Sequence, residues 1–196
     1  MLALPTLKKA CTRCRCVFAG DYPEDPADYD IVGQGAAFRV GEFVRTGQLL
    51  ASDGVLRRVS VSLVGCEFVD NVAFEGSELV AWGPHSLTIE GTRFVNGTST
   101  TSFGAIMLSF HNFGKPAHWR LDVDIAHSSF SGHRCGVNTI CDSSVYGGAI
   151  AAQQGVSLNV RDTSFVDNFG YYGGAIFLDF DSYFRCFRCV FDVSRR

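Results

Sequence analysis

The chain has 196 residues, enough for one domain, and combines 46% hydrophobic residues with 17 Phe and 21 Gly but only 5 Pro. This composition excludes disordered and collagen-like chains and is typical of a turn-rich β protein. The net charge of −3 arises from scattered basic and acidic residues, which gives no electrostatic footprint for nucleic acid. No apolar run approaches the roughly 18–20 residues of a transmembrane helix, so we expect no transmembrane segment.

The first ten residues place their leucines before the Lys8-Lys9 pair, which is the reverse of a secretory signal peptide. Either the chain is not secreted by this route or its true start lies upstream. Eight cysteines and the acceptor triplet that begins at Asn96 nevertheless favour an oxidising, extracellular or cell-surface location. Asn96 is therefore the candidate glycosylation site.

Short segments that end in phenylalanine recur at intervals of 25, 26, 36, 35 and 26 residues. The two long intervals equal a 26-residue period plus insertions, and Cys16-Val-Phe18 adds a degenerate copy upstream. These phenylalanines are the candidate core stack. They are Phe43, Phe68, Phe94, Phe130, Phe165 and Phe191.

Other positions keep the same register. Seven and five residues before each of the last five phenylalanines the side chain is apolar, and the residue between them is polar. This alternation with a period of two, held over five copies, is typical of a half-buried strand. The apolar positions are Val61, Leu63, Leu87, Ile89, Val123, Ile125, Leu158, Val160, Phe184 and Cys186.

Strand-only repeats with one apolar face stack as solenoids, because each turn can bury that face only against its neighbours. We therefore predict one all-β domain over residues 1–196, a parallel β-helix of six to seven turns of about 26 residues. Insertions at 19–34, 111–119 and 131–145 are expected to form loops. Neither end of the repeat looks capped, so we expect a segment of a longer solenoid, or a unit that stacks end to end or docks onto a larger assembly.

The alternation of Gly-Gly-Ala-Ile with Phe-x-x-Asn resembles the repeat of the polymorphic outer membrane proteins of chlamydiae. It is seen at Gly147 to Ile150, Gly173 to Ile176, Phe68 to Asn71 and Phe165 to Asn168. The resemblance covers roughly residues 36–194. It implies a right-handed β-helix of the pectin-lyase-like kind and a role in adhesion at the cell surface.

The cysteines suggest disulfides rather than metal ligands, because their spacings complete no zinc or haem pattern. Cys135 and Cys141 bracket five residues of an insertion, which suits a local disulfide; two free loop thiols are the alternative. Cys186 and Cys189 are the other disulfide candidates. Cys66 and Cys189 each stand two residues before a phenylalanine and are expected to face the core. We predict neither a metal nor a cofactor.

Asp122 and Asp124 share one strand face by the period of two, and the next turn offers Arg161 and Asn159, with Arg185 one turn further. This is the best candidate for a catalytic or calcium-binding patch, and a solvated polar ladder is the alternative. The histidines show no metal or nucleophile spacing and are expected at turns or on the surface. They are His85, His111, His118, His127 and His133.

Together these patterns favour a non-enzymatic structural or adhesive module that presents its loops to protein or glycan partners. The alternative is a polysaccharide-active lyase or hydrolase that uses Asp122 and Asp124, with Arg161 as the basic residue. Fold alone does not decide between them.

Overall fold

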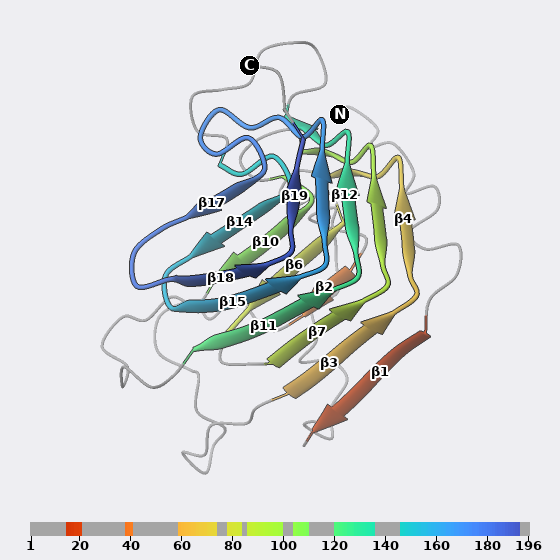
Figure 1. Cartoon of the computed structure of the whole chain (residues 1–196). Helices are drawn as coiled ribbons and strands as arrows, with labels where there is room; N and C mark the ends of the chain where they lie inside the picture. The colour runs from red at the N-terminus through yellow and green to blue at the C-terminus, as the bar shows by residue number, and fades with distance from the viewer. Residues whose placement is uncertain are drawn as a thin grey trace, which may run out of the picture.

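The computed structural model describes residues 15–20, 38–40, 59–73, 78–83, 86–99, 104–109, 120–135 and 146–192. These residues form β-strands and turns and contain no helix. Strand pairing within their sheets is parallel, except where β1 (Arg15–Gly20) meets β3 (Val59–Val64). The prediction of an all-β protein is confirmed for this part of the chain, and the parallel sheets are consistent with a β-helix-like fold (Figure 1).

Three large sheets and one small sheet surround the core. The six-stranded sheet has the order β1, β3, β7 (Ser86–Glu90), β11 (Leu121–Ala126), β15 (Val156–Arg161) and β18 (Tyr183–Phe187). One five-stranded sheet has the order β17 (Ile176–Leu178), β14 (Ile150–Gln153), β10 (Ile106–Ser109), β6 (Leu79–Trp82) and β2 (Phe38–Val40). The other has the order β19 (Val190–Phe191), β16 (Ser164–Val166), β12 (Ser129–Ser131), β8 (Arg93–Val95) and β4 (Glu67–Val69). The small sheet joins β13 (Arg134–Cys135), β9 (Thr98–Ser99) and β5 (Val72–Ala73).

Successive strands of the chain belong to different sheets, and from β3 onward each repeat visits the three large sheets in the same order. Val123 therefore lies between Leu87 of the preceding repeat and Leu158 of the following one. The predicted register of the repeats places these residues side by side.

The repeating phenylalanines form one column of stacked rings. Ring centroids are 5.0 Å apart for Phe68 and Phe94, and 4.6 Å apart for Phe94 and Phe130. Phe165 continues the column 5.1 Å from Phe130, and Phe191 follows at 5.0 Å. The rings are almost parallel, with interplanar angles of 2–7°. Phe43 lies outside the described residues.

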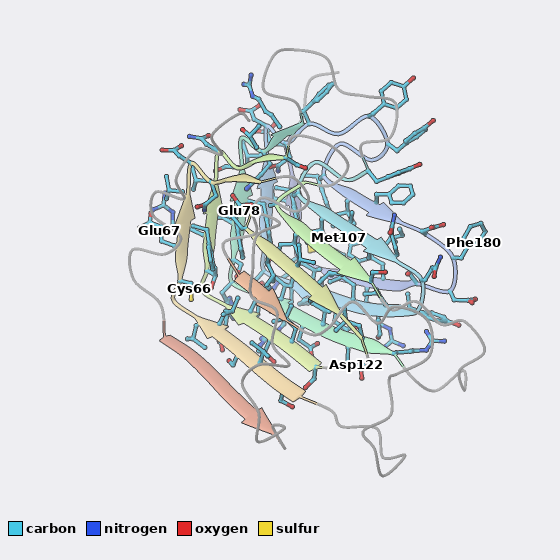
Figure 2. The ribbon with its side chains drawn as sticks, turned by 180° about the vertical axis from the view of Figure 1, so that it is seen from behind. Cys66, Glu67, Glu78, Met107, Asp122 and Phe180 are labelled. Atoms are coloured by element: carbon cyan, nitrogen blue, oxygen red, sulfur yellow. A yellow bond between two sulfur atoms is a disulfide. The ribbon has the colours of Figure 1, made fainter. Side chains whose placement is uncertain are left out.

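The aliphatic columns beside the rings are equally buried, and together they make a continuous core from Val61 to Phe165. A second, smaller cluster of Val80, Met107 and Ala151 lies on the other face of the sheet that contains β6, β10 and β14 (Figure 2). Residues Ile106–Ser109 of β10 are therefore buried on both faces.

The corners between strands repeat their backbone conformation. The residue three before each phenylalanine of the column has a positive φ, whether it is Gly65, His127 or Arg188. In the Gly-Gly-Ala-Ile motif, Gly147 also has a positive φ of 63°, and a Cβ on Gly148 would lie 2.1 Å from the carbonyl oxygen of Gly174. The first glycine thus serves a left-handed turn and the second allows close approach of the next repeat.

The predicted copy around Phe18 is not a repeat of the same kind. β1 runs antiparallel to β3, with Phe18 paired to Val61 in the six-stranded sheet rather than in the phenylalanine column. In the sequence, Cys11 and Arg13 stand at the positions that are Val, Leu or Ile in most other copies, so the alternation that predicts an inward strand face is absent from this copy. Pairing along the edge of β3 satisfies its backbone hydrogen bonds instead.

Two predicted loops are shorter than expected. Ala19 and Gly20 belong to β1, and Ser131 and residues 134–135 lie in β12 and β13. The structure also describes Gly132 and His133. The described residues do not include 21–34, 111–119 or 136–145. Strand pairing therefore continues into both ranges for a few residues before the insertions begin.

We expect Phe130→Ala to lower the free energy of unfolding by about 3–5 kcal/mol, because the ring is fully buried between two others. Urea unfolding followed by circular dichroism measures the change. Phe187→Ala is the matched control, since that ring is 63% exposed and its loss should cost at most about 0.5 kcal/mol. Equal destabilisation by the two substitutions would contradict the buried column.

Candidate functional site

The two predicted aspartates lie on the outer face of β11. Asp122 and Asp124 are both exposed, and Figure 2 labels Asp122 near the start of β11. Asp124 pairs in register with Asn159, which pairs in turn with Arg185. Arg161 pairs with Ala126, one outward position further along the strand, and so does not lie opposite either aspartate.

Aromatic and basic side chains extend this outer face toward the last strand. The guanidinium carbon of Arg120 lies 4.1 Å from the ring centroid of Tyr183, a cation–π contact. On β15 and β18, a shallow depression of about 210 Å³ is lined by Asn159, Arg161, Arg185 and Phe187, together with Val160 and Cys186. The face therefore offers hydrogen-bond donors, acceptors and aromatic rings on a flat support.

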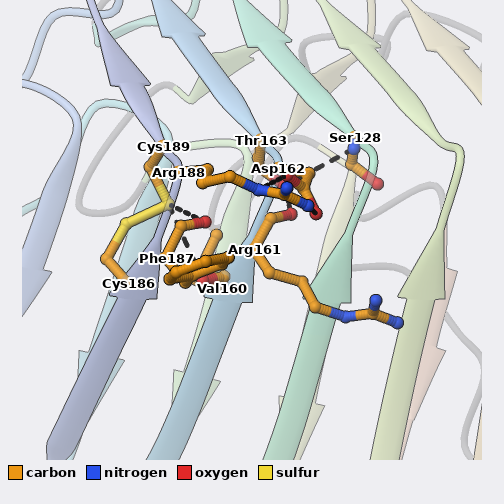
Figure 3. The surroundings of a disulfide bond; sticks show 9 residues. All are labelled: Ser128, Val160, Arg161, Asp162, Thr163, Cys186, Phe187, Arg188 and Cys189. Carbon is orange, nitrogen blue, oxygen red and sulfur yellow. Dashed lines mark hydrogen bonds and ion pairs between the residues drawn. A yellow bond between two sulfur atoms is a disulfide. The ribbon is translucent and has the colours of Figure 1, made fainter.

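A second polar group occupies one corner of three successive repeats. Arg188 makes a two-pronged ion pair with Asp162, in which Nη2 donates to Oδ2 at 2.8 Å (Figure 3). Nδ1 of His127 lies 3.9 Å from the same oxygen. These residues occupy equivalent positions, three before Phe130, Phe165 and Phe191. An open depression of about 330 Å³ lies among them, lined also by Ser129, Ser164 and Val190.

The hydrogen bond from Arg188 lowers the pKa of the Asp162 carboxyl, and the positive charges of Arg188, His127 and Arg161 act in the same direction. Partial burial opposes this by favouring the neutral acid, but it is the weaker influence. Asp162 raises the pKa of Arg188 in return. The corner therefore carries a fixed anion and a fixed cation at neutral pH.

A fully buried polar group, which sequence reasoning missed, joins Glu78, His133 and Asn168. Asn168 donates from Nδ2 to the carbonyl oxygen of Phe130 at 3.0 Å, so its Oδ1 accepts from the backbone N–H and from Nδ1 of His133, at 3.2 and 2.8 Å. Nδ1 of His133 must then carry a proton. Its Nε2 lies 3.5 Å from Oε1 of Glu78.

His133 lies at the turn between β12 and β13, as one of the two expected locations, but its complete burial was not predicted. It stands three residues after Phe130, where Phe-x-x-Asn places Asn71 and Asn168, both also buried. The position of His133 within the Phe-x-x-Asn repeat is therefore the sequence feature that could have predicted its burial. His127 is a turn residue with a half-exposed side chain, and the other histidines lie outside the described residues.

A ladder of buried hydroxyl groups was also missed. The ladder runs through the residues that stand two before each phenylalanine of the column. The backbone N–H of each donates to the hydroxyl of its equivalent one repeat later: Cys66 to Thr92 at 3.3 Å, Thr92 to Ser128 at 3.2 Å, and Ser128 to Thr163 at 3.4 Å. Each hydroxyl then donates to the carbonyl two residues before it. The sequence signal is the series of Cys, Thr and Ser residues that stand two before each phenylalanine from Phe68 to Phe191.

Cys186 and Cys189 form a disulfide across the corner between β18 and β19 (Figure 3). Cys66 is buried in the core, and Cys189 is partly buried against it. Cys186 occupies an inward position of its repeat but is exposed, because no further repeat among the described residues covers it. Cys135 lies in β13, and Cys141 lies outside the described residues, so the predicted pairing of Cys135 with Cys141 stays a prediction.

Asn96, the candidate glycosylation site, is an exposed corner residue with a φ of 54°. Its Nδ2 donates to Oδ1 of Asp70, the equivalent corner residue one repeat earlier, at 3.3 Å. A Cβ at the next equivalent residue, Gly132, would lie 2.4 Å from Oδ1 of Asn96. The side chain thus lies along the outer edge of the corner.

No family model, curated protein or solved structure matches the chain. Over the ranges that the structure describes, no three His, Cys, Asp or Glu side chains lie close enough together to hold a metal ion. The same ranges contain no helix that is long and apolar enough to cross a membrane.

We expect the pKa of Asp162, measured by NMR titration of its carboxyl carbon, to lie below its usual value and to return toward it in Arg188→Gln. Because the pKa is lower in the folded chain, the ion pair stabilises the fold above the unfolded-state pKa. This contribution is lost as the pH falls below about 4. Arg161→Gln is the control and should shift the pKa less, since Arg161 contributes only through its more distant charge. An unshifted pKa in the parent chain would contradict the ion pair.

Proposed function

We propose that the protein is a non-enzymatic structural or adhesive module of the cell surface that presents loops to protein or glycan partners. The observation that supports this most is the way the stacked repeats tolerate insertions. Phe94 and Phe130 are 36 residues apart in sequence, yet their rings lie 4.6 Å apart. This is no farther than the 5.0 Å between Phe68 and Phe94, which are only 26 residues apart.

Both insertions fall between strands of the sequence and not within a strand. Residues 110–119 lie between β10 and β11, and residues 136–145 lie between β13 and β14. Of the strands on either side, β10, β11 and β14 keep parallel partners in both neighbouring repeats, and β13 keeps its parallel partner β9. A rigid support with variable corner segments is the arrangement that many binding proteins use.

The finer architecture belongs to the same proposal. We infer that the repeats are turns of a right-handed parallel β-helix of the pectin-lyase-like kind, as the resemblance to the polymorphic outer membrane protein repeat implies. The parallel register between consecutive repeats and the single column of phenylalanines support this inference. An extracellular location is supported by the Cys186–Cys189 disulfide and the exposed Asn96.

Replacing residues 111–119 or 136–145 by a short Gly-Ser linker should abolish binding to a partner and leave the unfolding midpoint nearly unchanged. Surface loops can be shortened at a cost of about 1 kcal/mol or less, because closure entropy varies slowly with length. Binding is measured by surface plasmon resonance on immobilised polysaccharides and extracellular-matrix glycoproteins. Asp122→Asn/Asp124→Asn is the control and should bind as the parent does. Undiminished binding by both loop variants would refute the proposed role of the loops.

The enzyme alternative is favoured by one observation: Asp122 and Asp124 are exposed together on β11, and Asp124 lies in register with Asn159 and Arg185. We expect the parent chain to cleave none of a panel of neutral and acidic polysaccharides, as followed by release of reducing ends and of unsaturated products. Cleavage that disappears in Asp122→Asn/Asp124→Asn but persists in Ser62→Ala, on the same face two strands away, would establish the alternative instead.

A further inference from the structure

His133 lies at the base of an insertion. It directly precedes β13, and residues 136–145 directly follow this strand in the sequence. β13 is only two residues long, and among the described strands it pairs with β9 alone. So short a strand with one partner holds a segment weakly. The contacts of His133 therefore matter for how firmly the base of the insertion is held.

Residues of two other repeats hold His133. In the following repeat, Oδ1 of Asn168 accepts from its backbone N–H and from Nδ1, and the N–H of Phe169 donates to its carbonyl oxygen at 2.8 Å. On the other side of the ring, Nε2 lies 3.5 Å from Oε1 of Glu78, which directly precedes β6 two repeats earlier (Figure 2). The side chains of Glu78, His133 and Asn168 are fully buried. The group thus joins three repeats through one ring.

The contact between Glu78 and His133 spans the intervening repeat, which carries small residues at both positions. Gly97 is in register with His133, since β9 and β13 pair directly after these two residues. Ala105 is in register with Glu78, since β6 and β10 pair directly after them, and the N–H of Glu78 donates to the Ala105 carbonyl oxygen at 3.0 Å. Neither residue has a side chain longer than a methyl group. The two long side chains can therefore meet across this repeat.

Glu78 and His133 are both exceptions at their positions in the repeat. The equivalent residues are Ala105, Ala149 and Ala175 for Glu78, and Asn71 and Asn168 for His133. Burying a carboxyl group in place of a methyl group costs free energy unless a polar group faces it, and the same holds for a ring nitrogen. Because the two exceptions face each other, each supplies the polar neighbour that the other requires.

We propose that Glu78 and His133 form an anchor that holds β13, and with it the base of the 136–145 insertion, against the repeat that contains β6. Glu78 is a positioning residue in this device, because it acts on β13 only through the His133 ring. The anchor explains why the two exceptional residues occur together and why small residues lie between them. It does not depend on what the insertion binds, so it is independent of the adhesive function proposed above.

Hydrogen exchange of the Arg134 amide reports on the anchor directly, because this N–H in β13 donates to the Gly97 carbonyl oxygen at 3.0 Å. Glu78→Ala should make this amide exchange about tenfold faster or more, since it removes one partner of a buried pair. Glu78→Gln should retain exchange close to that of the parent, because the Gln amide can donate to Nε2 of His133. Ser109→Ala, which removes a buried hydroxyl group from β10, is the control and should leave the rate unchanged. Parent-like exchange in Glu78→Ala would overturn the proposal.

The double variant Glu78→Ala/His133→Asn tests the pairing, since it places the residues of other repeats at both positions. Its urea unfolding midpoint should lie closer to that of the parent than the midpoint of His133→Asn, which leaves the Glu78 carboxyl group buried without the ring. Losses of stability that simply add would overturn the proposal. In the unmodified chain, NMR of the His133 ring should show a proton on Nδ1, and a ring protonated at Nε2 alone would contradict the anchor. None of these outcomes bears on whether the insertion binds a partner.

Discussion

The parallel register between consecutive repeats is the constraint on which the rest of the structure depends. Each residue lies beside the equivalent residue of the next repeat, so the side chain at a given position must pack against the side chain at the same position one repeat away. Phenylalanine satisfies this condition well, since its flat rings stack about 5 Å apart along the whole column. The corners obey the same condition, and for this reason positive φ angles recur at equivalent residues even where the residue is not glycine.

The same constraint decides where the chain can vary. A residue added within a strand would shift every later residue out of register with both neighbouring repeats, whereas residues added between strands leave that register intact. Insertions are therefore confined to corners, and Phe94, Phe130 and Phe165 remain stacked across two of them. The corner residues Asp162 and Arg188 show a second kind of variation, in which equivalent positions in adjacent repeats carry opposite charges and pair.

Features that depend on local alternation were predictable from the sequence. The apolar positions around Val123 and Leu158 follow a period of two, and this pattern defines the inward face without knowledge of any neighbour. Burial of polar groups was not predictable in this way. Thr163 and His133 are ordinary turn residues in isolation. Only the adjacent repeat supplies their partners, which are the backbone N–H of Ser128 for Thr163 and the side-chain amide of Asn168 for His133. The direction of β1 was missed for the same reason, because it depends on which edge of the sheet is open rather than on its own residues.

The buried polar groups explain why this stack of similar repeats adopts one register. Apolar columns alone tolerate displacement, since leucine, isoleucine and valine can replace one another along a column at little cost. The ladder through Thr92 and Ser128 and the contacts of Asn168 do not tolerate it. A shift of one residue would leave a buried N–H or carbonyl without its partner, at a cost of about 1–3 kcal/mol each. The phenylalanine column therefore supplies much of the stability of the stack, while the hydroxyl ladder and Asn168 fix which residues lie beside one another.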